Sequence, residues 1–175
     1  MPSPNKLSKI KAILFDVDGV LTDGLINVDS LGNQSLNFNV KDGQLISFMQ
    51  KNGYIFGAIS GRKSEPVVHR LNSLNIDFIR LGIQDKRASL DEFKTLFSLE
   101  LDSICYIGDD VIDLSVLSAV GFSVSPSDAI HLVKDRVDYI ALSPGGGGVL
   151  REVIDKLILN DETLVESLTT HYRFS

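Results

Sequence analysis

Short apolar runs alternate with longer stretches of helical periodicity along this chain. The apolar runs predict strands at residues 10–15, 54–59, 78–81, 103–107, 121–124 and 139–142. Each run is compact and largely apolar, which is typical of strands that are covered on both faces. Helices are predicted between them at residues 42–52, 65–74, 86–96, 112–120, 128–134 and 149–160. The alternation favours a Rossmann-like three-layer α/β sandwich with a mainly parallel sheet, whose ligand site lies beyond the carboxyl ends of the strands.

One segment interrupts this alternation. Residues 25–28 and 35–38 flank a polar turn and predict a β-hairpin inserted after the first strand, a minimal cap on the domain. Residues 160–175 form a polar tail, in which we expect Tyr172 or Phe174 to reach a neighbouring subunit. With 175 residues, the chain is expected to be a single domain over residues 1–175.

Composition narrows the functional classes. The net charge of −6 disfavours a nucleic-acid partner, and it implies that a site for an anionic substrate must be locally basic. No apolar run approaches the roughly 18 residues of a membrane helix, and the N-terminus lacks the apolar core of a signal peptide. The single cysteine, Cys105, suits a reducing compartment. We therefore expect a cytoplasmic protein without a membrane partner.

The strongest candidate for chemistry follows the first predicted strand. Asp16 and Asp18 lie two residues apart at the strand end, where they can share one metal ion and one reacting phosphorus. A solvated acidic turn is the plain alternative. A calcium loop is excluded, because its pattern needs an oxygen ligand at the fifth position and Gly at the sixth, whereas Gly19 is fourth and Val20 fifth.

A second acidic cluster, Asp109, Asp110 and Asp113, follows the strand at 103–107. By itself it is as consistent with a helix N-terminal cap as with a metal site. Such close carboxylates repel one another unless a cation or hydrogen bonds offset them. Together with the first cluster in a parallel sheet they predict a site of hard oxygen ligands, which favours Mg²⁺.

Two weaker signals involve cations. Ser60-Gly61-Arg62-Lys63 follows a strand and precedes a helix, so its hydroxyl, amides and cations can receive phosphate oxygens. The alternative is a helix-entry turn with surface charges. Lys86 opens a predicted helix, and alone it would be interpreted as a solvated charge.

These motifs occur in the order found in haloacid dehalogenase phosphatases, which the chain resembles from residue 11 to residue 159. Within that superfamily it is most similar to the 3-deoxy-D-manno-octulosonate 8-phosphate (KDO 8-phosphate) phosphatases of lipopolysaccharide sugar synthesis. The strings that carry the resemblance are Asp16-Val-Asp-Gly-Val-Leu-Thr-Asp-Gly24, Phe38-Asn-Val-Lys-Asp-Gly43, Ser60-Gly-Arg-Lys63 and Gly145-Gly-Gly-Gly-Val-Leu-Arg-Glu152. Ser60 stands where these enzymes commonly have threonine, and the hydroxyl is preserved.

The resemblance implies a role for each residue. Asp16 is the nucleophile that forms an aspartyl-phosphate, and Asp18 is the general acid and base. Mg²⁺ binds the Asp16 carboxylate, the Asp18 backbone carbonyl and Asp109, while Asp110 and Asp113 orient their neighbours. Ser60 and Lys86 are catalytic as well, because they hold the transferring oxygens. The phosphorylated keto-sugar acid contacts Asp18 and the residues Ser60, Gly61, Arg62, Lys63, Lys86 and Arg151. Relatives with so small a cap are tetramers, in which a neighbour's hairpin closes each site.

Three rival functions stay open at this point. A nonulosonate 9-phosphate phosphatase would share the chemistry, but those relatives tend to carry Gly-Glu-Lys at the position of Gly61-Arg62-Lys63. A non-catalytic assembly domain would not need both Asp16 and Asp18. A phosphoryl-accepting receiver would place an adjacent acidic pair after the first strand, whereas here Asp109-Asp110 comes late.

Overall fold

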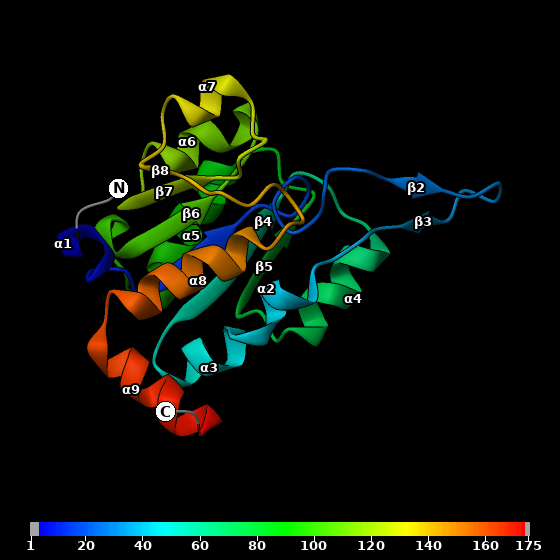
Figure 1. Cartoon of the computed structure of the whole chain (residues 1–175). Helices are drawn as coiled ribbons and strands as arrows, with labels where there is room; N and C mark the ends of the chain where they lie inside the picture. Colours follow the sequence, from blue (N-terminus) through cyan, green and yellow to red (C-terminus); the bar gives the residue numbers. More distant parts are fainter. Residues whose placement is uncertain (1–3, 174–175) are drawn as a thin grey trace.

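The computed structural model describes residues 4–173. Within them a six-stranded sheet runs in the order β5-β4-β1-β6-β7-β8 (Figure 1). Each neighbouring pair of strands in this sheet is parallel, which confirms the predicted α/β class. The strands are β1 (Ala12–Phe15), β4 (Ile55–Ser60), β5 (Phe78–Leu81), β6 (Ile104–Ile107), β7 (Phe122–Ser125) and β8 (Tyr139–Ile140).

Helices cover both faces of the sheet and complete the three layers. Along β1, Ile13 and Phe15 face one apolar cluster, while Ala12 and Leu14 face the other. The first cluster packs under α3 (Ile46–Lys51), α4 (Glu65–Ser73), α8 (Val149–Leu159) and α9 (Glu162–Tyr172). The short α2 (Val40–Gln44) lies against α8. The second packs under α5 (Lys86–Phe97), α6 (Leu114–Leu117) and α7 (His131–Lys134). Among the described residues, no helix has the length and apolar character needed to cross a membrane.

Three helical segments differ most from the expectation, and α7 begins at His131 instead of at residue 128. The helix predicted at 42–52 is divided into α2 and α3 at Leu45, shortly after Gly43, a weak helix former. The helix predicted at 112–120 is a 3₁₀ turn, η2 (Val111–Asp113), followed by the short α6. The tail forms α9, which buries Leu164 against the first apolar cluster. Tyr172 is half exposed at its end, and Phe174 lies outside the described residues.

The hairpin is present but shorter than predicted. Its strands are β2 (Asn27–Val28) and β3 (Gln34–Ser35), and they project from the body of the domain (Figure 1). The Asp29 carboxylate accepts the N–H groups of Leu31 and Asn33, which closes the turn. The hairpin exposes the apolar side chains Leu25, Val28 and Leu31 to solvent in the single chain.

Asp42 supplies an N-terminal cap to a helix distant in sequence. Helix α8 begins after Gly148, which has no side chain to cap it. Instead the buried carboxylate of Asp42 in α2 accepts the N–H of Arg151 at 3.0 Å. Burial raises the pKa of Asp42 to about 6, from an ordinary value of 3.8. The contact joins α2 to α8 at the cost of a desolvated carboxylate.

This pKa predicts how stability depends on pH. A pKa raised in the folded state contributes stability that is complete below the unfolded value and is lost as pH rises through about 6. We expect Asp42→Asn, which keeps the acceptor oxygen, to remove this dependence. The unfolding free energy of the wild type relative to the variant should fall by on the order of 2–3 kcal/mol between pH 4 and pH 7.5. Urea unfolding at several pH values measures it, with the exposed Asp102 as the control in Asp102→Asn. Parallel profiles for wild type and Asp42→Asn would contradict the assignment.

Candidate active site

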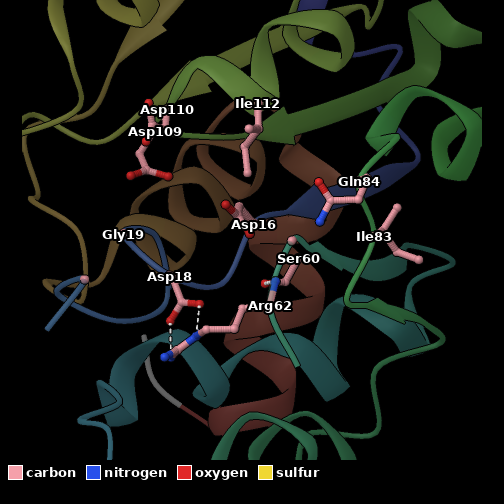
Figure 2. Close-up of a pocket in the computed structure, with 12 residues that line it drawn as sticks. Asp16, Asp18, Gly19, Ser60, Arg62, Ile83, Gln84, Asp109, Asp110 and Ile112 are labelled. Carbon is pink, nitrogen blue, oxygen red and sulfur yellow. Dashed lines mark hydrogen bonds and ion pairs between the residues drawn. The ribbon is translucent and has the colours of Figure 1, made fainter. Parts of the chain in front are cut away.

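The predicted chemical residues converge at the carboxyl ends of the central strands. Asp16 directly follows β1, Ser60 ends β4, Lys86 opens α5 after β5, and Asp109 lies just after β6. Asp16, Ser60 and Asp109 line a cavity of ≈ 410 Å³ (Figure 2). The other lining residues are Asp18, Gly19, Gly24, Gly61, Arg62, Ile83, Gln84, Asp110 and Ile112. The structure therefore brings together groups that lie up to about a hundred residues apart in the chain.

Lys86 lies buried between two carboxylates. Its ammonium is 2.8 Å from Asp16 Oδ2 and 2.7 Å from Asp113 Oδ1, and the lysine side chain is fully shielded from solvent. Burial lowers the pKa of Lys86, but the two carboxylates outweigh this effect and raise it. The second oxygen of Asp16 accepts the N–H of Val17 at 2.6 Å. Lys86 is thus a fixed positive charge beside Asp16 and not a solvated surface group.

The carboxylates at the base of the cavity are held against mutual repulsion. Burial, and then the Asp113 carboxylate, raise the pKa of Asp16 to about 7. Burial, followed by Asp16 and Asp113, raises that of Asp109 to about 8. Oxygens of Asp16, Asp109 and Asp113 lie within 4.8 Å of one another. Among the described residues, the buried Asp109 Oδ1 has no hydrogen-bond partner. Such a cluster can hold a divalent cation, which would relieve the repulsion and satisfy the unpaired oxygen.

Asp113 is itself saturated with donors. Its Oδ1 accepts from Lys86 and from the Tyr106 hydroxyl, at 2.7 and 2.6 Å. Its Oδ2 accepts the N–H groups of Asp109 and Asp110. Asp110 caps η2 through its own carboxylate, and the two residues form a capping box. Both interpretations of this loop therefore apply, but to different residues: Asp110 and Asp113 form the helix cap, and Asp109 is available to a metal ion.

Asp18 and Arg62 form an ion pair at the mouth of the cavity. The guanidinium donates from Nε and one terminal nitrogen to the two Asp18 oxygens, both at 3.0 Å (Figure 2). The backbone N–H of Arg62 also donates to Ser60 Oγ at 3.3 Å. Both oxygens of the carboxyl group that the sequence predicts as the general acid are thus bound to Arg62.

The expectation of a locally basic site is wrong. The cations at the cavity, Arg62 and Lys86, are each already paired with carboxylates. Asp109 and Asp110 add further negative charge to the lining. When ionised, these carboxylates would repel an anionic substrate, and a cation bound to them would offset that repulsion.

Two predicted substrate-binding residues are placed elsewhere. In the part of the chain that the structure describes, Lys63 and Arg151 do not line the cavity. Lys86 does not line it either, but its ammonium lies 2.8 Å from Asp16, which does. Lys63 is exposed beside the tip of the hairpin, and Arg151 pairs with Asp155 at 2.7 Å on α8. The glycine-rich segment before Arg151 does lie near the site, because Gly146 donates its N–H to Val20 O at 3.0 Å. A Cβ at Gly145 would meet Gly19 O at 2.2 Å, so this segment packs directly on the loop after β1.

Sequence reasoning missed Ile83, Gln84 and Ile112 in the cavity wall and Tyr106 beneath it. The wall residues belong to loops without a motif, so no local signal identified them. Tyr106 had one available signal, a hydroxyl inside an otherwise apolar strand.

Comparisons with known proteins agree with this geometry. Residues 67–153 match the family model of haloacid dehalogenase-like hydrolases. The 3-deoxy-D-manno-octulosonate 8-phosphate phosphatase of Escherichia coli K12 is 35% identical over 162 residues, which cover 93% of this chain and 86% of that one. The structure of the phosphatase of that name from Yersinia pestis has a TM-score of 0.89 at 33% identity, covering 93% and 88% of the two chains.

A third relative carries ligands. The Moraxella catarrhalis 3-deoxy-D-manno-octulosonate 8-phosphate phosphatase, in complex with a magnesium ion, a phosphate ion and a KDO molecule, has a TM-score of 0.91 at 32% identity. The match covers 96% of this chain and 97% of that one. Identity above 30% over nearly the full length places this chain among the haloacid dehalogenase-like hydrolases, in the family of the 3-deoxy-D-manno-octulosonate 8-phosphate phosphatases.

Proposed function

We propose that this chain hydrolyses KDO 8-phosphate to KDO and phosphate through an aspartyl-phosphate on Asp16. The observation that carries the proposal is the cavity in which Asp16 and Asp109 face each other with the buried Lys86 ammonium 2.8 Å from Asp16. A binding or assembly domain has no need of a charged group desolvated at such cost. A phosphoryl-transfer site does, because fixed charges stabilise the transferring oxygens.

The chain's own residues divide the reaction between them. Asp16 attacks phosphorus in line, with its orientation fixed by the Val17 N–H and by Lys86. Ser60 and Lys86 receive the transferring oxygens. Asp18 protonates the leaving sugar oxygen and then deprotonates the attacking water, after its carboxyl has exchanged the Arg62 guanidinium for the substrate. The released Arg62 is then available to an anionic group of the sugar.

Mg²⁺ fits the carboxylates of Asp16 and Asp109 and the backbone carbonyl of Asp18. Asp113 orients these ligands instead of binding the ion, because all four donors at its two oxygens are already in place. Bound there, the ion would supply positive charge that offsets the carboxylates and allows a phosphate dianion to enter.

Gly19 provides a test of this metal site. Its φ is +84°, and a Cβ there would lie 2.1 Å from Asp109 Oδ2. Gly19→Ala should displace the Asp109 carboxylate, so we expect the Mg²⁺ concentration for half-maximal phosphate release to rise at least ~10-fold. The matched control is Gly32→Ala, since Gly32 has φ +86° with nothing within 4 Å of its Cβ position. Both variants bear a similar backbone strain of about 1–2 kcal/mol. Equal Mg²⁺ dependence in the two would argue against Asp109 as a ligand.

Substrate choice and assembly belong to the same proposal. The string Gly61-Arg62-Lys63 favours KDO 8-phosphate over a nonulosonate 9-phosphate as the substrate, because phosphatases of the nine-carbon acid tend to carry Gly-Glu-Lys there. The exposed apolar side chains of the hairpin support a homotetramer in which a neighbour's hairpin closes each site. The buried free thiol of Cys105 is consistent with cytoplasmic lipopolysaccharide sugar synthesis.

A phosphate-release screen tests the function. Purified protein would be assayed with and without Mg²⁺ on a panel of phosphosugars that includes KDO 8-phosphate and a nonulosonate 9-phosphate. We expect Mg²⁺-dependent release with the highest kcat/KM on KDO 8-phosphate. A tenfold or greater preference for the nine-carbon substrate would replace the substrate while keeping the mechanism. Absence of release from every phosphomonoester would overturn the function and favour an assembly role.

A further inference from the structure

Tyr106 is a buried aromatic residue of β6 to which the proposed mechanism gives no role. Its side chain is fully shielded from solvent and packs in the second apolar cluster with residues of α5 and α6. A phenylalanine would fill the same space without a polar atom to satisfy. Packing alone therefore does not explain why this position has a hydroxyl group, and its hydrogen-bond partners suggest an explanation.

The hydroxyl donates to Asp113 Oδ1 at 2.6 Å. The same oxygen accepts from the Lys86 ammonium at 2.7 Å, and that ammonium also lies 2.8 Å from Asp16 Oδ2. Burial and the neighbouring Asp113 carboxylate raise the pKa of Tyr106 well above its ordinary value, so the phenol stays protonated and keeps the proton that it donates to Asp113. A continuous hydrogen-bonded chain thus runs from Tyr106 through Asp113 and Lys86 to Asp16.

The two carboxylates compete for one ammonium. Asp113 Oδ1 would attract Lys86 more strongly if Lys86 were its sole donor, because a hydrogen bond from the tyrosine disperses part of the charge on that oxygen. With the hydroxyl in place, Lys86 remains within reach of Asp16. Without it, the ammonium would be drawn toward Asp113 and away from the reacting phosphoryl oxygens.

We infer that Tyr106 is a positioning residue for phosphoryl transfer, whose hydroxyl acts through Asp113 to hold the Lys86 ammonium beside Asp16. The inference rests on the proposed function, because it assigns to Lys86 the stabilisation of transferring oxygens. It extends the site by one residue beneath the cavity, since Tyr106 does not line the space that a substrate enters.

Tyr106→Phe tests the inference, because it removes the hydroxyl and keeps the ring. Lys86 would assist the transferring oxygens most strongly in the transition state, so kcat on the best substrate of the panel should fall about 10-fold while KM changes less than about 2-fold. Tyr139→Phe is the matched control. Tyr139 also donates its hydroxyl to a carboxylate, Glu152 Oε1 at 2.7 Å, but it lies outside the cavity. We expect similar losses in Tm for both variants and an unchanged kcat for Tyr139→Phe.

A double-mutant cycle separates an effect through Asp113 from a general loosening of the core. In an Asp113→Asn background, assayed by single turnover at high enzyme concentration, Tyr106→Phe should change the rate less than about 2-fold. An undiminished effect in that background would overturn the inference, as would equal kcat for Tyr106→Phe and Tyr139→Phe. A rise in KM alone would also overturn it. Wild-type turnover in the same assay keeps the proposed function standing in each of these cases, so the two failures are distinguishable.

Discussion

Asp16→Asn is expected to lower phosphate release at least ~10³-fold, because an amide lacks the nucleophilic oxygen that forms the covalent intermediate. Asparagine has nearly the shape of aspartate, so the fold should be retained and the loss should appear in kcat. Stopped assays with KDO 8-phosphate and Mg²⁺ measure the rate, and circular dichroism checks the fold. Rapid quench with ³²P-labelled substrate should show labelled protein in the wild type and none in the variant.

The control for this substitution comes from the same loop. Asp23 is exposed and accepts the N–H of Leu25 through one oxygen, a bond that asparagine can also accept. Asp23→Asn should therefore keep kcat within a few-fold of the wild type. If Asp16→Asn retained turnover comparable to that of Asp23→Asn, Asp16 could not be the phosphoryl acceptor.

Lys86→Met is expected to damage both stability and activity. The substitution leaves the buried Asp16 and Asp113 carboxylates without the ammonium between them, which should cost about 3–5 kcal/mol of unfolding free energy. Loss of a preorganised cation at the transferring oxygens should lower kcat about 10²–10³-fold in protein that remains folded. Urea unfolding and phosphate release at a temperature well below Tm measure the two effects separately.

Lys94 provides the comparison within the same helix. It is partly exposed and lies 3.7 Å from Glu100, so Lys94→Met removes a surface pair worth less than about 1 kcal/mol. Near-equal stabilities of Lys86→Met and Lys94→Met would mean that the buried ion triad contributes nothing net to the fold. A fully active Lys86→Met would remove lysine from the mechanism.

The sequence predicted the central sheet well for a physical reason. Parallel strands buried on both faces are short apolar runs, so β5 (Phe78–Leu81) has the predicted bounds and β1 differs only at its start. Local helix boundaries were less predictable, since they depend on contacts made across the fold. The 3₁₀ turn at Val111–Asp113 depends on such contacts, because Asp113 accepts hydrogen bonds from Lys86 and Tyr106.

The sequence predicted which strand-end motifs form the site. It did not predict which charged side chains are buried or how they pair. Taken alone, Lys86 is indistinguishable in the sequence from a surface lysine. It is only 1% exposed because α5 starts directly beside Asp16. The described cavity has no excess of positive charge, because its cations are offset by carboxylates from other strand ends. Arg62, for example, is paired with Asp18. The Asp18–Arg62 pair joins residues 44 positions apart, so it has no signature in the local sequence.

The glycine-rich segment before α8 also sets an order of events during synthesis. Every side chain proposed for catalysis has been synthesised once Asp113 has been translated. The loop that carries Asp16 and Asp18 is fully packed only after Gly145 and Gly146 have been synthesised, because their backbone lies against Gly19 and Asp23. A nascent chain that stops short of these glycines would hold the complete set of reactive groups on an unsupported loop, so competence for turnover is acquired late in translation.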